Sequence, residues 1–491
     1  MKRYLLGIDV GTTGTKSLLF SESGELLGQA YCPYDTKTPQ VHYNEQDAQD
    51  WWRAVCKTVR EACGQHAPHV AAVSLSVQGG TVVAVDENGM PISPAIVWND
   101  ARGVREKEAY LQEVGDASTM YQKSGWNLIP GQPAVAIRWM KDNQPETFQN
   151  AAHFLTVPDY ISRKMTGVAA VDLSNLGINQ LGDIRRGCYD EQILGFAGIT
   201  EEKLAGLCRS GDVIGHLTPQ AAEELGLSTD VVLVAGAHDQ YAVALGAGAT
   251  RAGDILVGTG TAWVVTAMED KPAFETGLAQ SVAAVPGMWG SLLSLPSGGV
   301  CLEWWRKLTE RPDGTKIGYD EINREVAARK AAEDGLFFFP FAGKSSASRN
   351  FQKGTFVGLD LSHDKFHLAR AIMEGVAFQA VWMMESFRSK PSAEGLKLAG
   401  GAARSEFWCQ LMADIAGVPV RIPEVVDLAC VGAAILAGAG SGIYEDVREG
   451  YRRLAVKERV ITPDPERSKL YRQLLDRYKI CAQGLQNTYD A

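Results

Sequence analysis

The feature that most constrains the fold of this 491-residue chain is a strand–turn–strand unit that occurs twice, about half a chain apart. In the first copy, an apolar run at 5–10 leads into GTTGT at 11–15, and a second apolar run follows at 17–20. In the second copy, DILV at 254–257 leads into GTGT, and WVV follows at 263–265. Such runs around Gly-rich turns predict buried strand hairpins. A duplication on this scale predicts two similar lobes rather than a solenoid.

Helical patterns fill the sequence around these hairpins. Trp51, Val55 and Val59 share one helix face behind Asp47, a residue type that favours the N-cap position. Further helices are expected at 241–248, 368–387, 405–416 and 429–440, and after Asp464-Pro465. Strands are expected at 71–76, 82–85, 95–97 and 231–236. The prediction is an α/β chain of two closely coupled lobes, 1–250 and 251–491, with a central cleft between them.

Composition excludes several classes of function. The chain carries a net charge of −10 and has no basic run, which argues against nucleic-acid binding and against anionic membranes. Its nine cysteines are scattered and contain no C-x-x-C pair, so neither a disulfide framework nor a zinc site is expected, and a reducing cytosol fits best. No signal peptide or run of transmembrane length is apparent. We expect a cytoplasmic protein.

The two Gly/Thr turns are candidates for phosphate binding. Turns of this kind expose backbone N–H groups and hydroxyls together, and glycine lets a ligand approach closely. One such turn alone would be an ordinary hairpin, whereas two at matching positions favour a phosphate clamp. Neither turn has the Walker or the Rossmann spacing. A third glycine cluster, GGAARS at 400–405, has the form of a strand-to-helix turn, which is common without any ligand.

Two aspartates follow apolar strands. Asp9 faces the first turn and is a candidate Mg²⁺ ligand, with a turn-capping role as the alternative. Asp239 ends the strand before a predicted helix, where it could serve as a general base or as the helix N-cap. The two roles of Asp239 are compatible with each other.

A polar cluster with one aromatic residue, WNDAR at 98–102, also follows a strand. It could bind several hydroxyls while the indole covers a carbon face, or it could be a solvated loop. His363 and His367 have an i, i+4 spacing but lack a third ligand, so surface or capping roles are expected. No G-x-S-x-G motif marks a serine nucleophile.

Several longer motifs are specific enough to indicate a family. GTFVGL at 354–359 is followed after seven residues by HLARAIME at 367–374, and this long pattern is the most specific of them. The others are GIDVGTT at 7–13, PAIVWNDAR at 94–102, VPDY at 157–160 and GGAARS at 400–405. On these motifs the chain resembles, nearly end to end, the FGGY carbohydrate kinases, and within them it looks most like xylulose kinases. The resemblance implies the two-lobed, actin-like (ribonuclease H-like) ATPase fold, with ATP and Mg²⁺ as cofactors. A homodimer is left open.

The resemblance also assigns roles to individual residues. Asp239 matches the catalytic base, and Asp9 the acid near the metal and the phosphates. The nucleotide phosphates would be faced by Thr12, Thr13, Gly14 and Thr259. The nucleoside would lie along Gly299, Gly401 and Ser405. The sugar side would comprise Gln78, Gly79, Gly80, Trp98, Asn99, Asp100, Arg102 and Gln240.

Four positions depart from the family pattern. Xylulose kinases usually have Gln-Met-His where this chain has Gln78-Gly79-Gly80, so a bulky pair on the sugar side is missing. The loop at 342–345 lacks the usual Gly-Glu-Arg, Ala136 replaces a Lys, and Asp427 replaces a common Glu. None of these changes touches the phosphate clamp or the base. They bear on the identity of the sugar.

These observations predict ATP-dependent phosphorylation of a hydroxyl on a small sugar, with a pentulose such as D-xylulose first. Other acceptors of the same kind are ribulose, glycerol and sugar alcohols. An ATP-gated chaperone or filament subunit would share the clamp but would have no sugar. A degenerate kinase retained as a sugar-binding regulator would bind the sugar without phosphorylating it. The sequence does not name the sugar, the hydroxyl or the oligomeric state.

Overall fold

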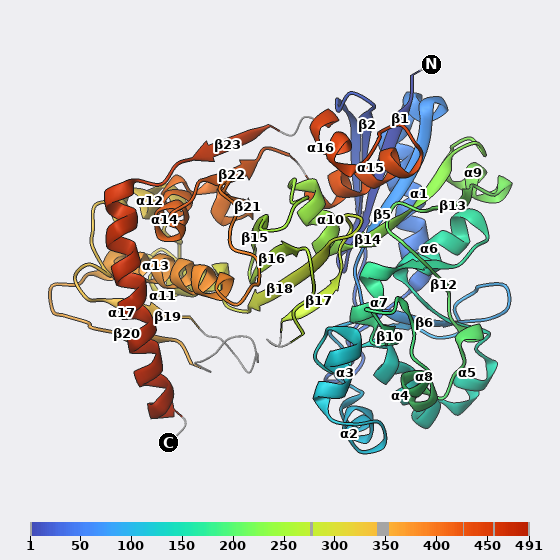
Figure 1. The fold of residues 1–491 in the computed structure, drawn as a ribbon, viewed down its shortest axis with the longest axis horizontal. Helices are drawn as coiled ribbons and strands as arrows, with labels where there is room; N and C mark the ends of the chain where they lie inside the picture. The colour runs from blue at the N-terminus through green and yellow to red at the C-terminus, as the bar shows by residue number, and fades with distance from the viewer. Residues whose placement is uncertain (1, 275–277, 341–352, 426, 455–456, 490–491) are drawn as a thin grey trace. The chain divides into compact units, whose positions relative to one another are not determined.

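The computed structural model describes residues 2–274, 278–340, 353–425, 427–454 and 457–489 (Figure 1). The chain forms two compact units. The first contains 1–250, 270–290 and 425–456, and the second contains 251–269, 291–424 and 457–491. The chain therefore first changes unit after Thr250 and re-enters the first unit twice. The loop at 342–345 that departs from the family pattern lies outside the described residues.

The first unit is built on a six-stranded sheet of order β13-β14-β5-β1-β2-β3. Strand β1 is antiparallel to β2 and parallel to β5, and β5 is parallel to β14. The apolar run of β1 is buried on both faces, as expected for a central strand. The bounds are β13 (Val213–His216), β14 (Val232–His238), β5 (Val70–Val77), β1 (Tyr4–Val10), β2 (Gly14–Ser21) and β3 (Leu26–Pro33).

Small residues bring a late helix of the chain against the first strand. Helix α15 (Leu428–Gly440) contacts β1 and α10 (Asp239–Gly246). A Cβ on Gly7 would lie 1.9 Å from the carbonyl oxygen of Cys430, so only glycine permits this approach. Likewise, a Cβ on Gly432 would lie 2.0 Å from the carbonyl oxygen of Ala242. The small-residue run at 429–440 is therefore a close-packing helix at the centre of the first unit.

The second unit repeats the central arrangement of the first. Its sheet contains the run β18-β16-β15-β21-β22-β23, in which β15 is antiparallel to β16 and parallel to β21. This matches β1 with β2 and β5, so the predicted duplication of the strand–turn–strand unit is confirmed. The bounds are β18 (Trp289–Leu295), β16 (Trp263–Glu269), β15 (Ile255–Thr259), β21 (Leu396–Gly400), β22 (Val420–Pro423) and β23 (Glu458–Ile461).

A buried ion pair on one helix of the second unit is hydrogen-bonded to a second helix. Arg370 and Glu374 lie one turn apart on α13 (Lys365–Met384), and Arg370 Nε donates to Glu374 Oε1 at 2.9 Å. Glu374 also accepts hydrogen bonds from the Tyr471 hydroxyl, 2.8 Å away on α17 (Pro465–Tyr489), and from the backbone N–H of Ala332 at 2.9 Å. Both charged side chains are almost fully buried. This network ties α13 to α17.

The remaining helices and strands surround these two sheets. The helices are α1 (Ala48–Cys63), α2 (Val104–Glu113), α3 (Ala117–Ser124), α4 (Pro133–Asn143), α5 (Pro145–Asn150), α6 (Val157–Thr166), α7 (Leu173–Asn179), α8 (Glu191–Ala197), α9 (Pro219–Leu225), α11 (Gly299–Leu308), α12 (Tyr319–Ala327), α14 (Glu406–Ala416) and α16 (Val447–Arg453). The strands are β4 (Glu45–Gln46), β6 (Val82–Val85), β7 (Ala95–Ile96), β8 (His153–Thr156), β9 (Ala170–Asp172), β10 (Gly182–Asp183), β11 (Cys188–Tyr189), β12 (Gly206–Cys208), β17 (Ala279–Val282), β19 (Phe337–Phe339) and β20 (Thr355–Val357).

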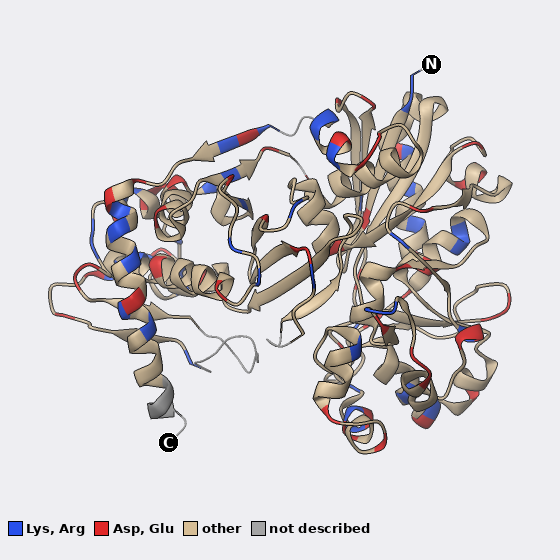
Figure 2. Cartoon of the chain, in the orientation of Figure 1, with Lys and Arg blue, Asp and Glu red and all other residues tan. Residues whose placement is uncertain are grey.

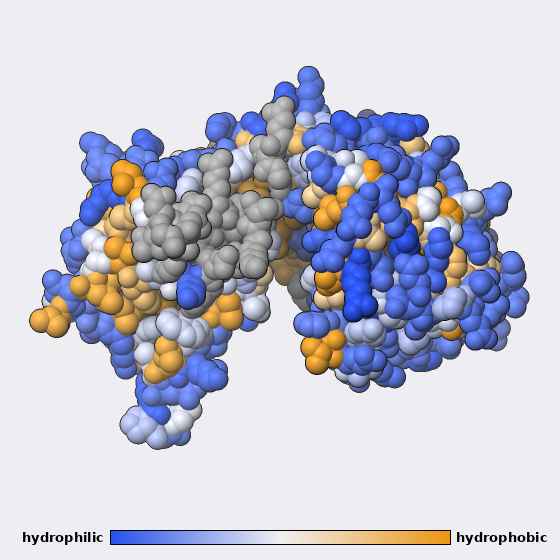
Figure 3. All heavy atoms as spheres, turned by 90° about the horizontal axis from the view of Figure 1, so that it is seen from below, coloured by the Kyte–Doolittle hydropathy of each residue, from blue (hydrophilic) through white to orange (hydrophobic). Residues whose placement is uncertain are grey.

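Charged residues of both signs are interspersed over the described surface. Helix α17, for example, carries mostly Lys and Arg, with Glu466 and Asp476 among them (Figure 2). The face drawn in Figure 3 is mainly hydrophilic and carries small hydrophobic groups. Among the described residues, no helix combines the length and the apolar character needed to cross a membrane.

The VPDY motif starts helix α6. Thr156 is the N-cap, and Asp159, at the third helical position, accepts hydrogen bonds from the backbone N–H of Thr156 at 2.8 Å and from the Thr156 hydroxyl. This is a capping box that fixes the start of the helix. Burial raises the pKa of the Asp159 carboxyl to about 7, and the nearby charge of Asp172 adds to the shift.

We expect Asp159→Asn to change the pH dependence of stability. The folded state holds a proton on Asp159 up to a higher pH than the unfolded state does. Stability is therefore lost as pH rises from about 4 to about 7, and the loss persists above pH 7. The variant lacks this titration, so its melting temperature relative to wild type should be higher at pH 8 than at pH 5. Thermal unfolding at both pH values measures the difference, with the exposed Asp142→Asn as control. An equal offset at both pH values would contradict a raised pKa.

Candidate functional site

The first Gly/Thr turn joins β1 to β2, and hydrogen bonds hold its shape. The backbone N–H of Gly11 donates to the carbonyl of Gly14 at 3.1 Å, and the Tyr34 hydroxyl donates to the carbonyl of Gly11 at 2.5 Å. Gly14 is packed so closely that a Cβ would lie 2.7 Å from the carbonyl oxygen of Cys32. Thr13 is exposed. The turn is thus a preformed loop with accessible polar groups, the form that phosphate oxygens require.

Asp9 ends β1 directly before this turn. Its Oδ1 accepts a hydrogen bond from the Ser76 hydroxyl on β5 at 2.7 Å. Burial, and then the negative charges of Asp427 and Asp239, raise the pKa of the Asp9 carboxyl to about 7, although the bond from Ser76 opposes the shift. Three carboxylates therefore act on one another at this edge of the sheet, so the expectation that the Asp427 departure does not touch the phosphate clamp is wrong. A cation placed there would relieve their mutual repulsion.

An ion pair that the sequence analysis missed lies beside Asp9. Lys16 on β2 is the register partner of Asp9, and its Nζ lies 2.6 Å from Oδ2 of Asp427. Asp427 also caps α15 by accepting from the backbone N–H of Cys430 at 3.1 Å. The signal available in the sequence was the position of Lys16, one residue past the turn. Its partner lies 411 residues away in the chain.

Asp9 fits the modest demands of a phosphate-bound Mg²⁺. In the described part of the chain, His, Cys, Asp and Glu side chains form no group of three or more that could hold a metal ion. Mg²⁺ at phosphate sites usually takes one or two carboxylates and fills its other positions with water and phosphate oxygens. A half-buried carboxylate in acidic surroundings at a phosphate-binding turn suits this arrangement.

Asp239 is the first residue of α10, and its carboxylate does not cap the helix. The N-cap position belongs to His238, so the N-cap role considered for Asp239 is excluded. The Oδ1 atom of Asp239 is buried and has no hydrogen-bond partner, although it lies 3.2 Å from Nε2 of His238. One oxygen of the Asp239 carboxylate is thus left without a hydrogen bond at the start of α10.

The predicted sugar-side residues connect to the first turn. The Thr12 hydroxyl donates to Oε1 of Gln78 at 3.1 Å and accepts from Nε1 of Trp98 at 3.0 Å. Gln78 is buried, whereas Trp98 and Asn99 are exposed and Gln240 is half-buried. One hydroxyl of the turn thus fixes two of the side chains proposed to face the sugar.

Asp100 and Arg102 are bound to each other instead of being exposed. Arg102 donates to the Asp100 carboxylate from Nε at 3.0 Å and from Nη2 at 2.9 Å, and it pairs with Glu45 at 2.9 Å. Asp100 also accepts from the backbone N–H of Asn44 at 2.6 Å. Both side chains are buried, and the guanidinium covers the ring of Tyr43. The structure gives this pair a role in holding the loop.

The second Gly/Thr turn connects to the third glycine cluster within the second unit. Thr259 is buried, and its hydroxyl donates to the carbonyl of Ala399 at 2.7 Å and accepts from the backbone N–H of Ala402 at 3.1 Å. The backbone N–H of Gly401 donates to the carbonyl of Thr259 at 2.7 Å. The Thr259 hydroxyl thus joins β15 to the end of β21.

Gly299 and Ser405 begin helices beside this turn. The backbone N–H of Gly299 donates to the carbonyl of Gly260 at 3.2 Å, and a Cβ on Gly299 would lie 2.6 Å from that oxygen. Ser405 caps α14 by accepting from the backbone N–H of Trp408 at 3.1 Å, and its hydroxyl donates to Oδ1 of Asn323 at 2.7 Å. The residues assigned to the nucleoside therefore share one edge of the second sheet.

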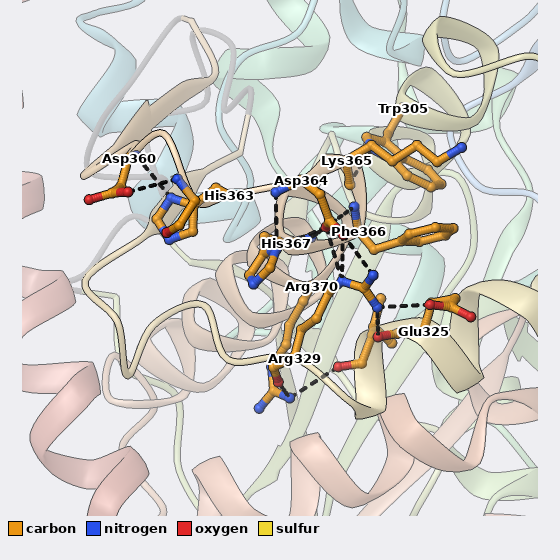
Figure 4. Close-up of polar contacts among 12 residues, drawn as sticks. Trp305, Glu325, Arg329, Asp360, His363, Asp364, Lys365, Phe366, His367 and Arg370 are labelled. Carbon is orange, nitrogen blue, oxygen red and sulfur yellow. Dashed lines mark hydrogen bonds and ion pairs between the residues drawn. The ribbon is translucent and has the colours of Figure 1, made fainter.

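The two histidines at i, i+4 spacing are capping residues, as expected. The Asp364 carboxylate accepts from the backbone N–H of His367 at 3.0 Å, and the Asp364 N–H donates to Nδ1 of His367 at 3.1 Å (Figure 4). Nδ1 of His363 accepts from the backbone N–H of Asp360 at 2.9 Å. Both rings stabilise the turn before α13, which Arg329 braces through its ion pair with Asp364.

Comparison with known proteins agrees with this geometry. Residues 4–246 match the N-terminal domain of the FGGY family of carbohydrate kinases, and residues 254–441 match the C-terminal domain. A gluconokinase of Bacillus licheniformis is 30% identical over 100% of this chain and 97% of its own length. An L-xylulose/3-keto-L-gulonate kinase of Escherichia coli is 29% identical over 99% of this chain and 98% of its own.

A solved structure supports the same assignment. The xylulose kinase of Rhodospirillum rubrum superposes with a TM-score of 0.91 at 26% identity, and the match covers 100% of both chains. The expected two-domain, actin-like ATPase fold is thus confirmed. The enzyme is a kinase that acts on a small-molecule sugar. The alternative functions of an ATP-gated chaperone or a filament subunit are therefore not supported. The chain belongs to the FGGY family of carbohydrate kinases.

Proposed function

We propose that this enzyme transfers the γ-phosphoryl group of ATP to a hydroxyl of a small neutral sugar, with a pentulose such as D-xylulose as the first choice. The observation that carries the proposal is the Asp239 carboxylate, which directly follows a buried strand, does not cap its helix and has an oxygen without a hydrogen bond. It lies in the same unit as Asp9 and the first Gly/Thr turn, close enough to raise the pKa of Asp9.

In the proposed reaction, Asp239 orients the acceptor hydroxyl and takes its proton as the oxygen attacks the γ-phosphorus. The new P–O bond forms to the sugar, the bond to the β-phosphate oxygen breaks, and ADP leaves. Backbone N–H groups and the Thr13 side chain of the first turn would bind the phosphate oxygens. Asp9 would hold Mg²⁺, which supplies charge neutralisation at the phosphates when bound.

The charges of the first unit favour a neutral acceptor. Asp9, Asp239 and Asp427 repel one another, Lys16 is paired with Asp427, and Arg102 is buried between Asp100 and Glu45. An anionic sugar acid would add a further negative charge to these surroundings. A sugar acid is the second candidate, because relatives named gluconokinase match the chain along its whole length. We place the reaction in the cytoplasm, in keeping with nine free cysteines.

A panel of acceptors tests the proposal. ADP release with Mg²⁺ is measured against ketopentoses, ketohexoses, pentitols, glycerol and gluconate, with a no-sugar control. We expect one pentulose to raise turnover well above the control and gluconate to raise it less. The order would reverse if the enzyme is a gluconokinase. Tight sugar binding in calorimetry without any ADP release would instead identify a sugar-binding regulator.

A further inference from the structure

The glycine pair Gly79-Gly80 leaves space that two other side chains fill. A Cβ on Gly79 would lie 2.7 Å from Cδ2 of His238 and 3.0 Å from its Nε2. A Cβ on Gly80 would lie 2.0 Å from Oε1 of Gln132, and Gly80 has a φ of +75° that favours glycine. A Cβ on Gly79 would also lie 2.7 Å from Cγ2 of Ile178, so a side chain at position 79 would displace His238 or Ile178, and one at position 80 would displace Gln132. Only glycine at both positions leaves room for the side chains of His238 and Gln132 where they lie.

His238 and Gln132 are buried, yet each has a polar atom without a partner. His238 is 4% exposed and Gln132 is 1% exposed. Nδ1 of His238 and Oε1 of Gln132 make no hydrogen bond, and neither does Oδ1 of Asp239 next to the His238 ring. Buried polar atoms are almost always hydrogen-bonded, and leaving them unpaired is costly. Two such atoms, on the side chains that pack against the two adjacent glycines, indicate a place where a ligand supplies the missing partners.

The surroundings of His238 tie this place to the proposed reaction. Nε2 of His238 lies 3.2 Å from Oδ1 of Asp239, and the Asp172 carboxylate is close enough to interact electrostatically with the histidine ring. The rings of Trp126 and Tyr241 contact the imidazole edge to face. Aromatic walls with a few polar atoms are typical of carbohydrate sites, because they cover C–H faces and bind hydroxyls.

We propose that His238 and Gln132, admitted by Gly79 and Gly80, recognise hydroxyls of the acceptor and determine which sugar is phosphorylated. The inference rests on the proposed function, and it names the residues that select the acceptor for that reaction. An imidazole nitrogen and an amide oxygen bind the hydroxyls of a neutral polyol, and both residues carry no permanent charge. An acceptor that lacks the matching hydroxyl leaves these buried atoms unpaired and is rejected.

The test compares acceptors rather than overall activity. Wild type, His238→Ala and Gln132→Ala are assayed by ADP release with the preferred sugar, its epimers and its deoxy analogues. For each variant we expect kcat/KM for the preferred sugar to fall about 10-fold, the effect of one lost hydrogen bond, mainly through KM. The KM for ATP should stay unchanged. The preference over the analogue that lacks the recognised hydroxyl should disappear, and His238→Asn, which keeps an N–H donor, should restore part of it.

Gly79→Ala tests the role of the glycine independently. Its methyl group would press on both the His238 ring and Ile178, and because the shift of the ring changes the acceptor contact, we expect the same loss of acceptor preference. Gly195→Ala is the matched control, because a Cβ there meets nothing within 4 Å. Equal losses for every acceptor, or an unchanged preference in all variants, would overturn the inference while leaving the kinase proposal intact. If wild type itself shows no sugar-dependent ADP release, the proposed function fails and the inference fails with it.

Discussion

Asp239→Asn is expected to keep ATP binding and to lose at least about 100-fold in turnover, the low end of general-base contributions. The asparagine has nearly the same shape but cannot accept the proton of the attacking hydroxyl. Because Asp239 does not cap α10, the change removes no helix cap. The measurement is kcat for sugar-dependent ADP release, together with the Kd for ATP from calorimetry.

Asp230→Asn serves as the matched control, since Asp230 lies in the same unit, is exposed and has a carboxylate that accepts a hydrogen bond from Ser228 of its own turn. It should leave both kcat and the Kd for ATP unchanged. Near-normal turnover in Asp239→Asn would remove Asp239 from the role of base. A parallel fall in melting temperature and kcat would point to damage to the fold instead.

Arg370→Met is expected to destabilise the protein by about 3–5 kcal/mol, the usual cost of removing one partner from a buried ion pair. Glu374 would keep its negative charge in a buried position, with only the Tyr471 hydroxyl and the N–H of Ala332 left to stabilise it. Urea unfolding followed by tryptophan fluorescence measures the change.

The double variant Arg370→Met/Glu374→Gln should recover much of this loss. Glutamine keeps an acceptor oxygen for Tyr471 and Ala332 without leaving an unpaired charge. Arg251→Met is the control, because its ion pair with Glu394 is exposed on both sides and contributes little. If Arg370→Met unfolds at the same urea concentration as wild type, the buried pair does not stabilise the second unit.

The parts of the fold that depend on nearby residues could be predicted from the sequence. Asp47 caps α1, Ser405 caps α14, and both Gly/Thr turns join antiparallel strands as the apolar runs indicated. Each of these features is set by residues within a few positions of one another, so their spacing carries the information.

Features that depend on distant residues could not be predicted. The Lys16–Asp427 pair joins residues 411 positions apart, and no local sequence pattern predicts it. His238 was visible beside Asp239, but its fit against Gly79 follows from the alignment of β14 beside β5. The burial of Asp100 and Arg102 is a further case. Their polar sequence predicts a sugar-side role, which stays a prediction, while the ion pair of Arg102 with Glu45 depends on a residue of the distant strand β4.

The close contact between α15 and β1 bears on how the protein is made. Gly7 on the first strand packs against Cys430, which lies on a helix that is synthesised more than four hundred residues later. Domains generally fold as units during synthesis. The first unit cannot be completed early, because its helix α15 lies in the segment 425–456, near the C-terminal end of the chain. The face of β1 that packs against α15 therefore lacks this helix during most of translation. A chaperone that shields apolar strands would act on this nascent chain for longer than on one whose first domain is continuous.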